Sequence, residues 1–432
     1  MSRTRWLILL AVGALLPAAT VCGCQRHQRD ITIRYMAWGN PDQLATEKTL
    51  IREFEKRNPG VRVKLTMVPH SAYHHKLIMM LASHTGPDVG RVDQYYFPSL
   101  VRDGYFECLD PFIRRDRLDL DDFFPQALEE CRYQGKVYAF NVLFGGRVVY
   151  YNKTMFERAG VPDPYQQWQD GKWTMDAYLQ AARRLTKKRG DTYVQFGTLL
   201  PWIWDLIWAF GGDILDEDME RCAIETPGGR AALQFMHDLR FKWHVAPSPA
   251  EASMAAFTFE SGRLGMVFGW AGESPRYRTT IKDFDWDIAP PPAGPGGRVT
   301  PVKGNQLFMY SESKHKPEAW RFIKFMTSQQ AEMLLCGRLR RAIPTRHSVA
   351  QDPHYLAPVD DKGRRVPPYQ IHVFTDVLNY GHRMPIDWKW YYWRPAMDAE
   401  IELLSIGELP ADRAAHRICQ VIDRGIRQAK EW

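Results

Sequence analysis

The sequence predicts an α/β fold of two lobes, each built on a mainly parallel sheet flanked by helices, with a ligand cleft between them. Strand and helix patterns alternate over the first hundred residues, which is typical of parallel sheets. The chain of 432 residues is longer than one hydrophobic core usually supports. The pattern later turns helical and then returns to strands, so we expect the chain to cross between the lobes more than once.

The first βαβ unit begins at residue 31. Residues 31–36 alternate as in a strand, and an amphipathic helix follows until the Asn-Pro-Gly of 58–60 ends it. Residues 61–65 form the next strand, which requires parallel pairing with a right-handed crossover. A second helix over about 72–83 leads to a short strand at 88–92.

Helical patterns dominate the middle of the chain, and strands return after residue 260. The expected helices cover 174–188, 201–210, 229–242 and 249–257. The later segments are strands at 262–269 and 285–289, a Pro/Gly loop at 290–297, an extended crossing at 299–305, a helix that starts near Pro317, and a last helix from Pro410 onward.

These elements divide the chain into a leader, a tether and two lobes. The expected boundaries are a signal peptide at 1–23, a tether at 24–30, an N-terminal lobe of 31–142 plus 305–345, a C-terminal lobe of 146–300 plus 350–432, and hinge crossings near 142–147, 299–305 and 342–350. Ligands of open α/β sheets bind at the carboxyl ends of strands, so two facing sheets predict a cleft between the lobes.

The first 24 residues indicate export and a lipid anchor. Arg3 and Arg5 precede an apolar run over 6–19, and the segment ends in Val-Cys-Gly-Cys, which resembles a bacterial lipobox with Cys24 as the acylated residue. An ordinary cleaved signal or a retained transmembrane anchor is the alternative. We therefore expect a monomeric protein outside the cytoplasm, attached to a bacterial membrane only through its N-terminal lipid.

Composition excludes some classes of protein. The net charge of +7 is a mild basic bias without a Lys/Arg-rich block, so nucleic acid is not an expected partner. Five cysteines remain after Cys24, an odd number whose wide spacing indicates neither a disulfide framework nor a zinc ribbon. Cys108 and Cys131 either pair or stay as two buried free thiols. The fifteen tryptophans suit packing and, at a cleft, a ligand with flat apolar faces such as a pyranose.

Seven short motifs, in order, resemble those of the family 1 extracellular solute-binding proteins, the maltose-binding-like receptors of ABC importers. They are FEKRNPGV at 54–61, GPDV at 86–89, GYFECLD at 104–110, GKVYAF at 135–140, YYNKTMFERAG at 150–160, KWTMD at 172–176 and FESGRLGM at 259–266. Asn141 replaces a usual proline and Gly265 a usual alanine. Most matched positions end helices or precede strands, so they identify the fold better than the ligand.

The resemblance implies a carbohydrate-binding component of an ABC importer that delivers its ligand to permease subunits. It implies no catalysis and no cofactor. Two alternatives stay open: the same fold with an anionic ligand, such as a sugar phosphate or glycerol phosphodiester gripped by Arg147 and Arg341, or a secreted carbohydrate-active enzyme.

Candidate ligand-binding residues lie where strands end or where the lobes meet. Those of the first lobe are Trp38 and Asn40 after the first strand, Tyr73 at the second helix, Asp93 and Gln94 after the third strand, and Asn305 and Arg341 near later crossings. Those of the second lobe are Arg147, Trp204, Asp205, Trp270, Glu273 and Trp388, with Trp202 as the alternative to Trp204.

Trp270 is the strongest of these candidates. It follows the buried strand at 264–269 and precedes a small turn, so one face of its ring is expected to be free for stacking on a sugar. His70, His74 and His75 tempt a metal assignment, but no carboxylate or cysteine stands at ligand spacing, so we expect no metal. Motifs such as GxSxG, HExxH or a phosphate-binding glycine loop are absent from the sequence.

Overall fold

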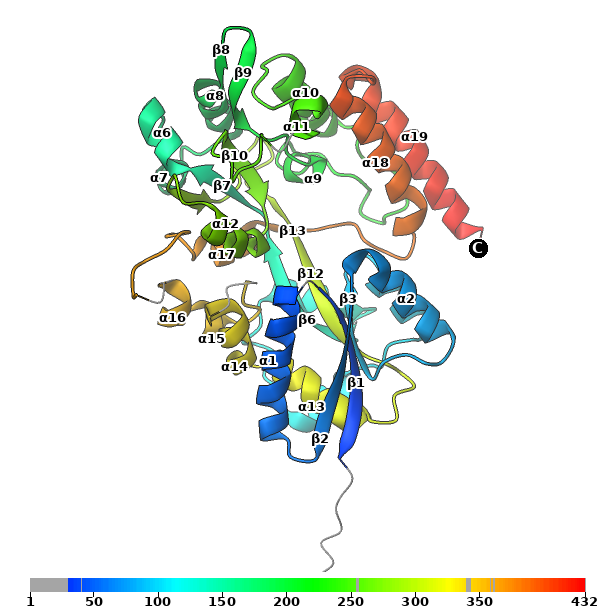
Figure 1. Ribbon diagram of the computed structural model, residues 1–432. Helices are drawn as coiled ribbons and strands as arrows, with labels where there is room; N and C mark the ends of the chain where they lie inside the picture. The colour runs from blue at the N-terminus through cyan, green and yellow to red at the C-terminus, as the bar shows by residue number, and fades with distance from the viewer. Residues whose placement is uncertain are drawn as a thin grey trace, which may run out of the picture.

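The computed structural model describes residues 30–39, 41–253, 256–338, 343–357, 359 and 362–431. Two bodies, each built around its own sheet, are joined by several passes of the chain (Figure 1). The α/β class is therefore confirmed. The expected leader with Cys24, and the candidates Asn40 and Arg341, lie outside the described residues.

The first sheet collects strands from distant parts of the chain. These are β1 (Ile31–Trp38), β2 (Val61–Val68), β3 (Val89–Asp93), β6 (Ala139–Gly146), β12 (Thr300–Met309) and β13 (Gly381–Arg383). β1 pairs parallel with β2 and β3, as the βαβ pattern predicts, and β12 runs antiparallel to β3 and β6. β12 also pairs parallel with β13.

Helices cover the first sheet, and a small hairpin lies beside it. They are α1 (Pro41–Arg57), α2 (His70–Ala82), α3 (Phe97–Arg102), α4 (Asp110–Asp116), α5 (Pro125–Glu129) and α13 (Lys316–Met326), with hairpin strands β4 (Arg132–Tyr133) and β5 (Lys136–Val137). The helix expected to start near Pro317 is α13, whose apolar side is buried, and Phe322 packs edge-on against Tyr35 and Phe54.

The second sheet has the order β11-β7-β10-β9-β8. Its strands are β7 (Val148–Asn152), β8 (Lys187–Arg189), β9 (Thr192–Thr198), β10 (Leu264–Gly269) and β11 (Trp286–Ala289). Only β9 and β10 pair in parallel among these described strands; the other three pairs are antiparallel. The expectation of a mainly parallel second sheet is therefore wrong. β8 turns back tightly into β9, and β7, which enters directly from β6 of the first sheet, lies antiparallel between β10 and β11.

The helices of the second body include a long C-terminal pair. They are α6 (Lys153–Ala159), α7 (Pro164–Gln169), α8 (Met175–Leu185), α9 (Ile203–Leu206), α10 (Pro227–Phe241), α11 (Pro249–Ser253), α12 (Ser274–Thr280), α18 (Trp390–Ile406) and α19 (Ala411–Lys430). Shorter helices connect the bodies late in the chain: α14 (Gln329–Glu332), α15 (His347–Ala350), α16 (Pro353–Leu356) and α17 (Val373–Asp376).

Two helices are shorter than the sequence predicts. The expected helix 174–188 begins where the Thr174 hydroxyl accepts a hydrogen bond from the Ala177 N–H, but it ends at Leu185. Residues 187–189 instead form β8, because Gly190 with its positive φ of 59° turns the chain back into β9. The expected helix 201–210 contracts to α9 at its start.

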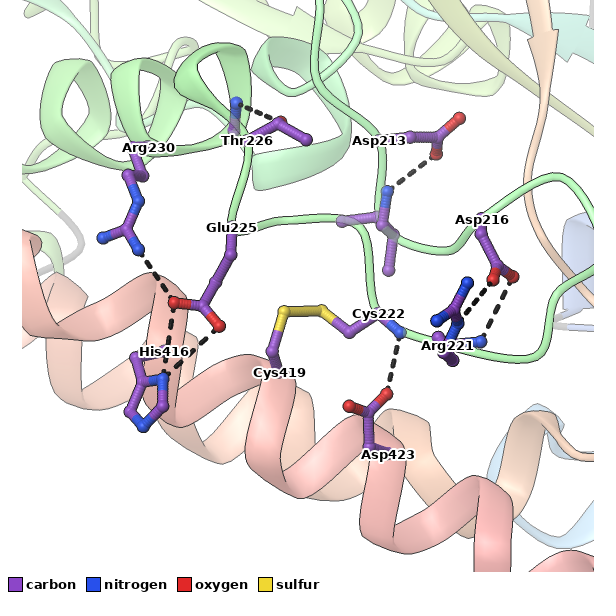
Figure 2. Close-up of a disulfide and its surroundings, with 12 residues drawn as sticks. Asp213, Asp216, Arg221, Cys222, Glu225, Thr226, Arg230, His416, Cys419 and Asp423 are labelled. Atoms are coloured by element: carbon purple, nitrogen blue, oxygen red, sulfur yellow. Dashed lines mark hydrogen bonds and ion pairs between the residues drawn. A yellow bond between two sulfur atoms is a disulfide. The ribbon is translucent and has the colours of Figure 1, made fainter.

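A disulfide joins Cys222 to Cys419 across 197 residues (Figure 2). Nearby, the Cys222 N–H donates to Asp423, and Glu225 contacts Arg230 and His416. These contacts fasten α19, and with it α18, to the loop before α10. Cys108 and Cys131 are free, so the considered pairing between them is wrong, and Cys336 is free as well.

No helix within the described ranges combines the length and the apolar character that crossing a bilayer requires.

Replacing both disulfide cysteines in Cys222→Ser/Cys419→Ser should lower the free energy of unfolding by about 2–4 kcal/mol, because the long closed loop no longer restricts the unfolded chain. Urea unfolding of the oxidised wild type and the double variant measures the difference. Added reductant should destabilise the wild type and leave the double variant unchanged. Equal stability of the two proteins would contradict a structural role for the bond.

Candidate functional site

Two passes of the chain between the bodies are tied together at Arg147. This residue lies between β6 of the first sheet and β7 of the second. Its backbone N–H donates to the Thr300 hydroxyl at 2.8 Å, and that hydroxyl donates to the Arg147 carbonyl at 2.9 Å. Thr300 begins β12 and is fully buried. The backbone of Arg147 is therefore held where the two sheets meet.

The side chain of Arg147 contacts groups of α9 and β10 and of the residues next to them. Its Nε lies 2.6 Å from Asp205 Oδ1, and a terminal nitrogen donates to the Phe268 carbonyl at 2.9 Å. The guanidinium carbon is 4.3 Å from the ring centroid of Trp202 and 5.5 Å from that of Trp270. One cation thus fixes two indole rings next to the ends of β9 and β10.

Asp205 completes this arrangement from the first turn of α9. It accepts a hydrogen bond from the Trp202 N–H at 2.9 Å, so the carboxylate holds the backbone of Trp202 while Arg147 stacks on the ring. Burial raises the pKa of Asp205 above its usual value, and the opposing charge of Arg147 lowers it in part. Removing one partner of such a pair is strongly destabilising, because the other charge stays buried without a counter-charge.

Aromatic side chains line a cavity of about 290 Å³ beside the start of α18, which we call the α18 cavity. The rings of Tyr95 and Trp390 are stacked, with centroids 5.1 Å apart and an angle of 11°, and Trp204 lies 5.9 Å from Trp390. Tyr95 follows β3, so both bodies contribute. The lining residues are Tyr95, Trp202, Trp204, Trp390, Tyr391, Arg394, Pro395 and Asp398.

A second cavity of about 290 Å³, the β10 cavity, lies at the carboxyl ends of β9 and β10. These strands are parallel, so their ends lie at one edge of the sheet, where ligands of α/β folds bind. The lining residues are Arg147, Leu199, Leu200, Trp202, Val267, Phe268, Gly269, Trp270, Glu273, Arg276 and Tyr277. Trp202 belongs to both cavities.

The first body faces this region with a polar group centred on Asp93. Its carboxylate is 3.5 Å from Lys303 Nζ and accepts from Asn305 Nδ2 at 3.3 Å. Burial lowers the pKa of Lys303, but Asp93 and Tyr95 together raise it above its usual value, so the ammonium stays charged. Lys303 Nζ lies 5.8 Å from the Trp270 ring centroid, which places Asp93 and Asn305 beside the same region.

His74 holds the backbone of Asp93 through a hydrogen bond. Its Nε2 accepts from the Asp93 N–H at 3.1 Å, and its ring stacks on Tyr96 at 4.1 Å. Burial lowers the pKa of His74 to about 4, so the ring is neutral at physiological pH. Within the described ranges, no three His, Cys, Asp or Glu side chains are grouped in a way that would hold a metal ion.

Every cation that lines the two cavities in the described part of the chain has a carboxylate partner. Arg147 pairs with Asp205, Arg394 with Asp398 at 2.6 Å, and Arg276 with Glu273 at 2.7 Å and with Glu260. The candidate Glu273 is therefore an ion-pair partner in the β10 cavity wall. The cavities present aromatic faces and paired charges rather than a free positive charge.

Several candidates lie away from the cavities. Tyr73 is fully buried, and its hydroxyl contacts the carbonyls of Met36 and Arg91. Trp38 packs against Tyr73 in the same core. Gln94 is buried and accepts from the Gly304 N–H. Trp388 lies under the guanidinium of Arg102, with 4.7 Å between them, in a contact that joins the two bodies.

Several residues that line the cavities are not among the sequence candidates. Tyr95 directly follows two candidates, and its position after a strand is a signal for it. The sequence favours Trp204 over Trp202, whereas Trp202 is 51% exposed and Trp204 only 2%. Trp390, Tyr391, Arg394 and Asp398 lie on α18, for which the sequence offered no positional signal.

Two further cavities lie on the second body. One of about 420 Å³ is lined by residues near Asp163 and Asp287, and one of about 300 Å³ by residues near Arg158 and Lys282. No lining residue of either comes from the strands of the first sheet or from the residues that directly follow them. We therefore take the α18 and β10 cavities as the candidate site.

A buried carboxyl lies below the site, where α5 meets β12. Glu130 is 3% exposed, and its carbonyl accepts from Gln306 Nε2. Burial raises the pKa of Glu130 from 4.5 to about 8, although the charge of Arg383 opposes this shift. The folded protein therefore keeps this carboxyl protonated at neutral pH.

Comparison with known protein families gives a match over most of the chain. Residues 38–333 match the family model described as bacterial extracellular solute-binding protein. A putative binding protein of Brucella abortus is 25% identical over 284 residues, which are 64% of this chain and 66% of that protein. The match thus spans slightly less than two thirds of that relative's length.

Two other similarities extend further along the chain. An uncharacterized lipoprotein of Streptomyces antibioticus is 26% identical over 341 residues, 75% of this chain and 72% of that protein. An ABC substrate-binding protein of Listeria monocytogenes, solved in complex with cycloalternan, has a TM-score of 0.80 at 22% identity and covers 93% of this chain and 100% of that one. At that identity the structural match shows the shared fold.

Asp205→Asn should lower the free energy of unfolding by about 3–5 kcal/mol, because Arg147 would remain buried without its counter-charge. Urea unfolding monitored by tryptophan fluorescence measures this. Glu225→Gln, which removes a half-exposed partner of Arg230, is the matched control and should cost no more than about 1 kcal/mol. Similar losses for both variants would contradict a special role for the buried pair.

The free energy of unfolding should also respond to pH through Glu130. The folded-state pKa is raised, so the stabilisation is present at low pH and is lost as the pH rises from about 4.5 to about 8. Glu130→Gln should weaken this loss by at least about 1 kcal/mol between pH 5 and pH 8. Urea unfolding at both pH values tests it, with the exposed neighbour in Glu129→Gln as control. Identical pH profiles for all three proteins would contradict the assignment.

Proposed function

Because this chain belongs to the family of bacterial extracellular solute-binding proteins, we propose that it binds an uncharged carbohydrate between its two bodies and delivers it to the permease of an ABC importer. The observation that carries the proposal is the pair of aromatic cavities where the sheets meet, with all of their described lining cations paired. The Listeria protein with the same fold was solved with cycloalternan, a carbohydrate.

The aromatic rings suit the apolar faces of sugar rings. A pyranose presents C–H groups on its flat faces and hydroxyls around its edge, so it requires both aromatic surface and hydrogen-bonding groups. Trp270 and Trp202 supply exposed ring surface in the β10 cavity, while Asp93 and Asn305 offer polar groups nearby. Of the sequence candidates, these and Trp204 remain our proposed contacts.

The paired charges favour a neutral ligand over an anionic one. The phosphate alternative rests on Arg147 and Arg341 facing the cleft, and it fails if each has a carboxylate partner. Arg147 pairs with Asp205, which counts against it, and Arg341 lies outside the described residues. The lining carboxylates Glu273 and Asp398 are likewise bound to arginines, which leaves the described cavities without the free carboxylate pair that glycoside hydrolysis uses.

Binding would be coupled to movement of the two bodies. Tyr95 with Trp390, Tyr96 with Tyr391, and Arg102 with Trp388 all join residues near the first sheet to residues near α18. We propose hinge crossings near 142–147, 299–305 and 342–350, so that a ligand contacting both bodies shifts the equilibrium toward the closed form. The protein would act as a monomer and carry out no chemistry on its ligand.

The location we propose is the outer side of a bacterial membrane, with acylated Cys24 as the anchor. The lipobox-like end of the leader supports this, and the Streptomyces relative is described as a lipoprotein.

Trp270→Ala should weaken sugar binding by about tenfold to a thousandfold. Stacking on a ring is worth roughly 0.5–1.5 kcal/mol beyond buried area, and the area itself adds roughly 25 cal/mol per Å². Calorimetry with a panel of mono- and oligosaccharides measures the affinity, and thermal unfolding measures stability. Normal affinity together with a large loss of stability would show that Trp270 only packs the core.

A further inference from the structure

The two cavities differ in how they are built, although they share Trp202. The β10 cavity is lined only by residues of the second body and of the crossing at Arg147. The α18 cavity also needs Tyr95, which follows β3 of the first sheet and stacks on Trp390. One cavity therefore exists on a single body, and the other is completed only when both bodies are in this position.

The two cavities are equal in volume, about 290 Å³ each, and aromatic residues contribute to the lining of both. A ligand of one sugar ring placed in either cavity would leave the aromatic residues of the other cavity to solvent.

Trp202 is held in a fixed position at the boundary. The guanidinium carbon of Arg147 lies 4.3 Å from the Trp202 ring centroid, and the backbone N–H of Trp202 donates to Asp205 at 2.9 Å. Even so, 51% of its surface is exposed. A large aromatic residue whose backbone and one side are held by neighbours, while half of its surface is exposed, is placed to contact a ligand rather than to fill the core.

We propose that the ligand is an oligosaccharide of at least two sugar rings, with one ring in each cavity and Trp202 contacting both. This inference rests on the proposed carbohydrate-binding function. The first ring binds the β10 cavity, which needs no contribution from the first sheet. The second ring then lies in the α18 cavity against the exposed rings of Trp202 and Tyr391, where Tyr95 completes the wall.

The test compares saccharides that differ only in length. Isothermal titration of the full protein with glucose, maltose and maltotriose, and with arabinose, arabinobiose and arabinotriose, gives the affinity for one, two and three rings. In at least one series the disaccharide or trisaccharide should bind at least about tenfold more tightly than its monosaccharide. Trp202→Ala should reduce that preference to about threefold or less.

Two further variants keep the result interpretable. Trp202→Leu retains apolar bulk without an aromatic face and should behave as Trp202→Ala does, which separates loss of the ring from loss of folding. Tyr392→Ala removes another exposed aromatic residue of α18 that lines neither cavity, and it should leave the preference unchanged. Thermal unfolding of each variant checks that it is folded.

The possible outcomes distinguish failure of the two-ring site from failure of the proposed carbohydrate binding. A monosaccharide that binds as tightly as its oligomers would overturn the two-ring site while leaving carbohydrate binding intact. A preference for oligomers that survives in both Trp202 variants would overturn the role of Trp202. If no saccharide of any length in a broad panel binds the folded wild type, the proposed function itself fails, and this inference fails with it.

Discussion

The buried contact between Arg147 and Asp205 is the interaction on which the rest of the site depends. Arg147 lies where the chain passes from one sheet to the other, and Thr300 holds its backbone against the second pass. Its guanidinium then fixes Asp205, the end of β10 and two indole rings. A charge in this place is tolerated because its partner and hydrogen-bond acceptor are buried with it, so the position of the rings is set by electrostatics as well as by packing.

The same pairing determines what the cavities can recognise. Because Arg147 is paired with Asp205, and Arg394 and Arg276 are paired with carboxylates of their own, the described cavity walls offer little net charge to a ligand. Aromatic faces dominate instead, and α18 supplies several of them. This helix is packed on α19, which the Cys222–Cys419 disulfide fastens to the second body, so a covalent bond outside the cavity lining supports one of the cavity walls.

Much of the scaffold was predictable from local patterns. The alternation at 31–36 and 61–65 and the helix stop at 58–60 correctly predicted a parallel pair, because a crossover helix permits no other pairing. The position of Trp270 after a buried strand correctly placed it at a strand end, where α/β folds bind ligands. The directions of β7 and β8 were not predictable. β8 turns back through a short connection, and β7 pairs with β10 and β11, which follow it by more than 100 residues, so neither pairing leaves a local sequence signal.

By itself, the sequence determined the fold class, the order of most helices and strands, and the strand ends that carry Asp93 and Trp270, because periodicity and helix stops act over a few neighbouring residues. Only the tertiary structure decided that Trp202 is exposed while Trp204 is buried, that Arg147 is neutralised by Asp205, and that Cys222 pairs with Cys419. Those outcomes depend on which segments meet in space, and contacts between residues 58 or 197 positions apart leave no periodic trace in the chain.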